Sequence, residues 1–243
     1  MADILLEVCV DDIAGLKAAI KGGADRIELC SALSVGGLTP SVGLMSLAGR
    51  SPVPCYAMIR PRVGDFVYSA DELAVMEDDI RFAASCGIAG VVFGASLPDG
   101  RLDQNALMQL SEVIGSMPRT LHRAFDLVPD MEEAIEIAIS CGFERILSSG
   151  RAVSASDGID DLKTAIKTAA GRISIMPGSG VNLKTIDSLL AKLDVSEVHS
   201  SCSSSVGSNN PAVVDFGFSA SAIKQTDATI VRAMKNRIAS RTQ

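Results

Sequence analysis

The stretch ADRIELCSAL, residues 24–33, carries the pattern that decides the predicted fold. Ile27 and Leu29 are apolar and point to one face of a predicted strand. Arg26, Glu28 and Cys30 alternate with them and point to the opposite face. Such a strand is predicted to contact an apolar core with one face and a group of polar side chains with the other.

The stretch LLEVCV, residues 5–10, repeats the spacing Glu-x-Cys as Glu7 and Cys9. Two predicted strands with the same polar stripe indicate that both contribute to one shared site. The sequence therefore raises the question of which architecture brings these two stripes together.

Composition limits the kinds of partner that such a site can serve. The 243 residues are 47% hydrophobic, enough for one large core or two modest ones, and the formal net charge is −7. With no Trp and 4% aromatic residues, no nucleic-acid partner is predicted. The start MADILLEV lacks a basic segment before a long apolar run, so no membrane association and a cytoplasmic location are expected. A homo-oligomer is compatible with the sequence, which does not fix the number of subunits.

Eight short apolar or β-branched runs recur along the chain, and they begin near Ile4, Arg26, Cys55, Gly90, Thr120, Glu144, Ile173 and Ser196. Stretches with helical periodicity separate them, such as DELAVMEDDIRFAASCG at 71–87 and MEEAIEIAISCG at 131–142. Each interval has room for one crossover helix, which favours parallel strands. The pattern predicts eight strand–helix units.

Two pairs of similar segments favour a closed barrel over an open sheet. GADRIELCS at 23–31 resembles GFERILSSG at 142–150, and AMIRP at 57–61 resembles SIMP at 174–177. Both pairs lie four units apart, which favours a single TIM-type (β/α)₈ barrel of the α/β class, extending over residues 1–243 as one domain.

In such a barrel one face of each strand contacts the outer helices and the other lines the lumen. The predicted outward set is apolar: Leu6, Val8, Ile27, Leu29, Ile59, Leu121, Ile146, Ile173, Ile175 and Val198. The predicted lumen set is Glu7, Cys9, Arg26, Glu28, Cys30, Met58, Arg60, His122, Met176, Glu197 and His199. Carboxylates in the lumen are expected to pair with Arg26 and Arg60. The deeper charges then form a structural network or part of a site, and the residues near the C-terminal mouth are the functional candidates.

The chain also resembles a known family. The resemblance is carried by LEVCV, GGADRIELCS, GGLTPS, MIRPR, GDFVYS, GVVFG, HRAFD, ERILSSG, IMPGSGVN and EVHSS, from about residue 5 to about residue 201. These stretches closely resemble the CutC family of copper homeostasis proteins, which implies a TIM-type barrel and a role in copper handling in the cytoplasm. The chain departs from the family pattern at Ser179, where relatives often carry glycine, and at 202–219, a variable loop region.

The resemblance implies that Cys9 and Cys30 bind copper as Cu(I), a soft ion that prefers sulfur ligands. The repeated Glu-x-Cys spacing predicts that the two sulfurs lie at one level on adjacent strands, with Met58 as a third ligand. Buried cysteines also serve as small apolar residues, so packing is the alternative for this pair. The cysteines at 55, 86 and 141 are predicted to pack, and all six are expected to be free thiols.

A second hypothesis is a metal-independent enzyme. His122 and His199 end the fifth and eighth predicted strands, and imidazole beside carboxylate and guanidinium suits proton transfer, although neighbours can also simply satisfy a buried histidine. The candidate catalytic residues are Glu7, Glu28, Arg60, His122, Asp126 and His199.

Glycine- and serine-rich loops after the last three strands predict an anion pocket, since glycine lets backbone N–H groups approach a ligand. The candidate anion-binding residues are Arg62, Ser149, Gly150, Gly178, Ser179, Gly180, Ser200 and Ser201. The predicted enzyme would be an isomerase, epimerase or lyase acting on a small phosphorylated or carboxylated molecule.

Overall fold

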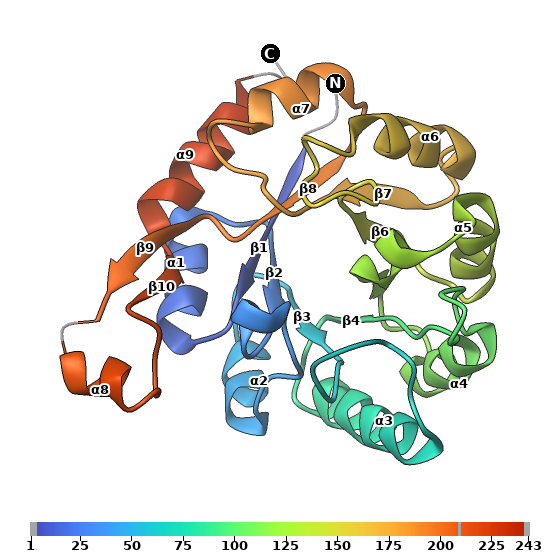
Figure 1. Ribbon diagram of the computed structural model, residues 1–243, viewed down its shortest axis with the longest axis horizontal. Coiled ribbons are helices and arrows are strands. Elements are labelled where there is room, and N and C mark those ends of the chain that lie inside the picture. Colours follow the sequence, from blue (N-terminus) through green and yellow to red (C-terminus); the bar gives the residue numbers. More distant parts are fainter. Residues whose placement is uncertain (1–3, 209, 241–243) are drawn as a thin grey trace.

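The computed structural model describes residues 4–208 and 210–240. Eight parallel strands form a ring (Figure 1): β1 (Leu5–Val10), β2 (Arg26–Leu29), β3 (Cys55–Met58), β4 (Gly90–Phe93), β5 (Arg119–Leu121), β6 (Arg145–Ser148), β7 (Ser174–Pro177) and β8 (Glu197–Ser200). Helices surround the ring: α1 (Ile13–Gly22), α2 (Val42–Ala48), α3 (Ala70–Ser85), α4 (Gln104–Ile114), α5 (Met131–Ser140), α6 (Ile159–Ala169), α7 (Ile186–Lys192) and α9 (Ala228–Ala239). Every strand begins within one residue of its predicted position.

The strands pair in the order β7-β6-β5-β4-β3-β2-β1-β8. Strand β1 pairs with β2 on one side and with β8 on the other, so the first and last strands of the ring are neighbours. Strands β7 and β8 approach each other without a hydrogen-bonded ladder between their described residues. The chain therefore forms a nearly closed (β/α)₈ barrel, which confirms the predicted fold class.

Local signals in the sequence set the ends of the helices. Helix α3 begins with a capping box, in which Ser69 and Glu72 each accept a hydrogen bond from the other's backbone N–H. Helix α1 begins at Asp12, which accepts from Gly15 N, and it stops at Gly23, whose left-handed backbone (φ 90°) suits glycine. These signals set where α3 begins and where α1 begins and ends.

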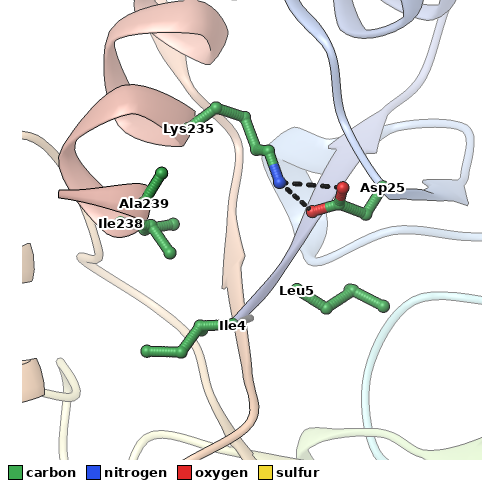
Figure 2. Close-up of a pocket in the computed structure, with 6 residues that line it drawn as sticks. All are labelled: Ile4, Leu5, Asp25, Lys235, Ile238 and Ala239. Carbon is green, nitrogen blue, oxygen red and sulfur yellow. Dashed lines mark hydrogen bonds and ion pairs between the residues drawn. The ribbon is translucent and has the colours of Figure 1, made fainter. Parts of the chain in front are cut away.

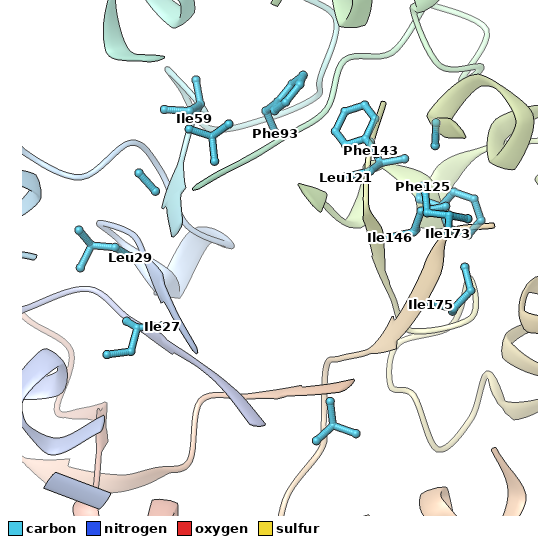
Figure 3. Packing of buried hydrophobic residues seen from close by; sticks show 14 of the residues in the cluster. Ile27, Leu29, Ile59, Phe93, Leu121, Phe125, Phe143, Ile146, Ile173 and Ile175 are labelled. Carbon is cyan, nitrogen blue, oxygen red and sulfur yellow. The ribbon is translucent and has the colours of Figure 1, made fainter. Parts of the chain in front are cut away.

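The main apolar core lies between the strands and the helices. All residues of the predicted outward set are buried in one cluster, and Figure 3 shows Ile27, Leu29, Ile59 and Ile175 on the outer side of the ring of strands. Cys55 and Cys141 belong to the same cluster, which confirms that they pack. The lumen is consequently left for the other face of each strand.

An excursion separates β8 from α9. It consists of β9 (Ser203–Gly207), helix α8 (Pro211–Asp215) and β10 (Ala222–Thr226), with β9 and β10 antiparallel. Figure 1 shows it projecting from the barrel beside α1. It covers the stretch expected as a loop and continues beyond it, so that part of the chain forms a small sheet of its own.

The two ends of the barrel differ in chemistry. At the N-terminal end, a cavity of about 340 Å³ is lined by Ile4, Leu5, Asp25, Lys235, Ile238 and Ala239 (Figure 2). Lys235 Nζ donates to Asp25 Oδ2 at 2.6 Å, which ties α9 to the start of β2. This end of a barrel serves stability, whereas sites form at the C-terminal end. Within the described residues, no helix has the length and apolar character needed to cross a membrane.

Candidate functional site

A network of charged side chains lies inside the barrel, below its C-terminal mouth. The Glu7 carboxylate is fully buried and accepts from Arg26 Nε. Arg26 Nη2 also donates to Glu197 Oε2 at 2.6 Å, and Arg145 Nε donates to the same oxygen at 3.1 Å. The expected pairing with Arg26 is confirmed, but the expected pairing with Arg60 is wrong, because Arg145 supplies the second guanidinium. Residues from β1, β2, β6 and β8 therefore meet inside the ring.

His199 links this network to the barrel mouth. Its Nδ1 lies 2.8 Å from Glu7 Oε1, and its Nε2 lies 3.9 Å from Glu28 Oε2. Burial opposes the charged imidazole, yet Cys9 and Glu28 raise the pKa of His199 well above its usual value. Burial, opposed by Arg26 and His199, leaves the pKa of Glu7 lowered to about 2. The result is a buried carboxylate–imidazole pair at the end of β8.

Cys9, Glu28 and His199 form a compact group of possible metal ligands. Their ligand atoms all lie within 4.8 Å of one another, and all three side chains are buried. Oxygen Oε1 of Glu28 is buried without a hydrogen-bond partner, and burial raises the pKa of this carboxyl group. A sulfur, an imidazole nitrogen and a carboxylate oxygen are therefore close enough together to share one ion.

The register of β1 and β2 differs from the expectation based on the repeated Glu-x-Cys spacing. Cys9 lies opposite Glu28, and Glu7 lies opposite Arg26. Cys30 is thus displaced by two residues along β2, and the prediction of two sulfurs at one level is wrong. The physical reason is the stagger of strands that a closed barrel requires, which offsets positions that the sequence repeat aligns.

Cys30 and Met58 lie next to this group in a small apolar cluster with Tyr56 and Val92. Cys30 Sγ donates to Glu28 Oε2 at 3.5 Å. Burial, followed by the Glu28 charge, raises the pKa of the Cys30 thiol well above its usual value. Cys30 is consequently a protonated neighbour of Glu28, whereas Cys9 stands beside His199.

A cavity of about 340 Å³ opens above Cys9 and His199 at the C-terminal end of the barrel. It is also lined by Ser179, Gly180, Val181, Asn182, Ser200, Ser201, Cys202, Ser203, Lys224 and Ile230. Four of the predicted anion-binding residues, namely Ser179, Gly180, Ser200 and Ser201, border this cavity. Sequence analysis missed Lys224 as a candidate, because it lies on β10, far from any motif.

The other predicted anion-binding residues lie elsewhere. Arg62 binds Glu72 and Asp65, and its Nη2 donates to the carbonyl of Val67 at 2.7 Å. It therefore braces the loop between β3 and α3. Gly178 packs against the side chains of Leu147 and His199, where an added Cβ would lie 2.5 Å from Leu147 Cδ1. Its small size makes room for these neighbours.

Asp126 and the serines after β6 form a separate hydrogen-bonded loop. Asp126 accepts from Ser148 Oγ at 2.6 Å, from Ser149 Oγ at 2.9 Å and from Arg123 Nε at 2.7 Å. An added Cβ at Gly150 would lie 2.1 Å from the carbonyl oxygen of Gly158. These contacts use Asp126, Ser149 and Gly150 to hold the loop, and they place none of the three in the cavity beside His199.

His122 and Arg60 form a second group at the ends of β5 and β3. His122 Nδ1 accepts from the N–H of Ala124 at 3.2 Å, and burial lowers the His122 pKa to about 3. Arg60 binds backbone carbonyls at the same end of the barrel. The sequence predicted one cluster with both histidines, but the ring separates β5 from β8, so the structure forms two.

Comparison with known proteins agrees with this architecture. The family model described as "CutC family" matches residues 4–204. A CutC family protein from Rhizobium meliloti is 57% identical over 98% of this chain and 97% of its own length. One from Sinorhizobium medicae is 58% identical over 97% of this chain and 96% of its own. A crystal structure from Streptococcus agalactiae, described as that of a proposed copper homeostasis protein CutC, is 32% identical to this chain. The match covers 82% of this chain and 98% of the Streptococcus agalactiae chain, with a TM-score of 0.77. The chain belongs to the CutC family.

Proposed function

We propose that the protein binds copper as its cargo at the barrel mouth, through Cys9 and His199 with Glu28 as a third ligand. The observation that carries the proposal is the convergence of the three ligand atoms within 4.8 Å. Thiolate and imidazole are ligands that Cu(I) accepts, and the unpaired Glu28 Oε1 is available to complete the group. The name of the Streptococcus agalactiae relative supports copper as the metal.

The surroundings of His199 support a ligand role. Metal-binding histidines usually donate their second ring N–H to a carboxylate, which fixes the orientation of the ring. Glu7 occupies that position at 2.8 Å from Nδ1, and Arg26 in turn holds Glu7. His199 Nε2 is thereby directed at Glu28 and Cys9. This proposal places the protein in the cytoplasm, where thiols stay reduced.

The test is competition for Cu(I) against a chelator under anaerobic conditions. Cys9→Ser and His199→Gln should each weaken binding by orders of magnitude, because each removes one of two strong ligands. Cys86→Ser is the matched control, since Cys86 is a half-buried residue at the end of α3, and it should retain wild-type affinity. Each variant is checked for folding by circular dichroism.

Cys30→Ser separates this ligand set from the one implied by the family resemblance. If Cys9 and Cys30 form the site with Met58, Cys30→Ser should weaken copper binding as much as Cys9→Ser. With Cys9, His199 and Glu28 as ligands, it should have a much smaller effect. Wild-type affinity in both Cys9→Ser and His199→Gln would contradict the proposal.

A second candidate function is an enzyme acting on a small anionic molecule. The observation that favours it is the cavity of about 340 Å³, which is larger than a metal ion needs and is bordered by Lys224, Ser179 and Gly180. His199, bound to Glu7, is placed to transfer a proton at the wall of this cavity. The substrate class is a phosphorylated or carboxylated small molecule.

A thermal-shift screen of such metabolites tests this second function. A true ligand should raise the melting temperature of the wild type, and Lys224→Gln should reduce that shift because the cation is removed. Lys192→Gln, at the end of α7 and outside the cavity lining, is the control. Equal shifts in Lys224→Gln and the wild type would contradict an anion site at this cavity.

A further inference from the structure

Apart from Glu28 Oε1, which belongs to the group around His199, the buried polar atoms without partners lie in the segments that follow β3, β4 and β5. Among the described residues, the buried side-chain atoms that lack a hydrogen-bond partner are Glu28 Oε1, Arg60 Nε, Tyr68 Oη, Ser96 Oγ and His122 Nε2. All belong to β2 or to the segments that directly follow β3, β4 and β5. Leaving a buried polar group without a partner is unfavourable, so this concentration calls for a physical explanation.

Arg60 is a buried cation without a buried anion beside it. Its Nη1 donates to the carbonyls of Val35 at 2.9 Å and Gly37 at 3.1 Å, and its Nη2 donates to that of Gly64 at 2.9 Å. No described acidic side chain lies within 4.0 Å of its nitrogens. Because an uncompensated buried charge is costly, the surroundings of Arg60 favour the approach of a negative group.

His122 offers a neutral donor in the same region. The N–H of Ala124 donates to Nδ1, so the ring proton of the neutral imidazole is on Nε2. Burial lowers the His122 pKa to about 3, and the imidazole is therefore uncharged at neutral pH. Its Nε2–H can donate one hydrogen bond, and no described residue receives it.

The half-buried ring of Phe66 contacts both of these groups. Its ring centroid is 4.6 Å from that of His122 and 5.0 Å from Arg60 Cζ. Its carbonyl accepts from the N–H of Ser96 at 2.8 Å, while Val63 on the same loop is exposed. The Phe66 ring is therefore the shared neighbour of Arg60 and His122.

We propose that Arg60 and His122 bind a small monocarboxylate beside Phe66, with one oxygen accepting from Arg60 Nε–H and the other from His122 Nε2–H. A carboxylate carries the single negative charge that Arg60 balances, whereas the second charge of a phosphate would have no cation here. Ser96 Oγ, also unpaired, can hydrogen-bond a polar substituent of the ligand. This site uses neither Cys9 nor His199, so it is independent of the proposed copper function.

The test is calorimetric titration of the full-length protein with acetate. Arg60→Gln should weaken acetate binding roughly tenfold or more, since it removes a charge-assisted hydrogen bond. His122→Phe keeps an aromatic ring without the N–H and should weaken binding about three- to tenfold. Arg119→Gln is the matched control, because Arg119 also binds three backbone carbonyls but starts β5 at the other end of the barrel.

A spectroscopic measurement on the wild type keeps the proposal testable if Arg60→Gln fails to fold. In ¹⁵N-histidine NMR, acetate should shift the Nε2–H signal of His122 and leave that of His199 in place. Cys9→Ser should keep acetate binding while it loses copper, so the two proposals can fail separately. Lack of saturable acetate binding at millimolar concentrations, or tighter binding of phosphate at His122, would overturn the proposal.

Discussion

The two histidines of the barrel mouth have the same chemistry and opposite surroundings. His199, at the end of β8, lies between Glu7 and Glu28, and its pKa is raised well above the usual value despite its burial. His122, after β5, receives a backbone N–H and has no carboxylate beside it, and burial lowers its pKa to about 3. Neighbouring charge, more than depth, decides which imidazole is protonated.

The same contrast extends to the arginines of the two regions. Arg26 is held by two carboxylates, whereas Arg60 is held by three backbone carbonyls. One region is therefore a closed network of opposite charges, and the other holds a cation and a neutral donor whose Nε–H and Nε2–H have no partner among the described residues. Our proposals assign copper to the region of His199 and an anion to the region of Arg60 and His122.

The largest expected effect comes from removing the carboxylate at the centre of the paired region. Glu7→Gln should lower the free energy of unfolding by about 3–5 kcal/mol, because the buried His199 Nδ1 loses its carboxylate and the buried Arg26 is left with Glu197 alone. Urea denaturation measures the loss. A loss below about 1 kcal/mol, which is typical of a surface pair, would show that the network is not needed for stability.

The next effect is the pH dependence contributed by His122. Its pKa is about 6.5 in the unfolded chain and about 3 in the folded protein, so its contribution to stability is complete above 6.5 and declines as pH falls. The unfolding free energy of the wild type minus that of His122→Phe should therefore decrease by about 1.4 kcal/mol per pH unit between pH 6 and 4. A difference that does not change with pH would mean that water reaches the imidazole.

His199 should show the opposite sign. Its raised pKa makes its contribution complete below about 6.5, and the contribution is lost as pH rises through the folded pKa. The free-energy difference between the wild type and His199→Gln should fall with increasing pH, by about 1 kcal/mol for the first unit above pH 6.5. In ¹⁵N NMR at neutral pH, His199 should be protonated and His122 neutral. If both were neutral, the contrast between the two regions would not hold.

The smallest effect is expected for an exposed ion pair. Arg172 Nη2 lies 2.5 Å from Glu136 Oε1, and both side chains are about half exposed. Glu136→Gln should lower the stability in urea denaturation far less than Glu7→Gln, because water and salt screen the pair. This is the same chemical change as Glu7→Gln, so the ratio of the two losses isolates the effect of burial. Equal losses would contradict that attribution.

Much of the architecture was predictable because it depends on periodicity. Apolar residues such as Ile27 and Leu29 recur at every second position, and this alternation located the strands within one residue. The alternation also assigned Glu7, Arg26 and Glu197 to the lumen, where the structure brings them together. Arg145 could have been included as well, since the echo of GADRIELCS in GFERILSSG gives it the position of Arg26.

The arrangement of the site was less predictable because it depends on height along the barrel and on distant segments. Arg60 was expected to meet a carboxylate, but the loops around it supply carbonyls from Val35, Gly37 and Gly64 at closer range. Lys224 reaches the mouth through an excursion that no sequence motif marks. Such contacts follow from how loops fold over the barrel.

By itself, the sequence determined that this chain forms a (β/α)₈ barrel with a polar lumen, since the alternation of side chains along a strand is a local property of the backbone. Only the tertiary structure decided that Cys9 faces Glu28 and His199 while Cys30 joins an apolar cluster. Closing the ring staggers neighbouring strands, and this stagger sets which side chains share a level. The face of each residue is thus encoded locally, and its partners are fixed by the closure of the barrel.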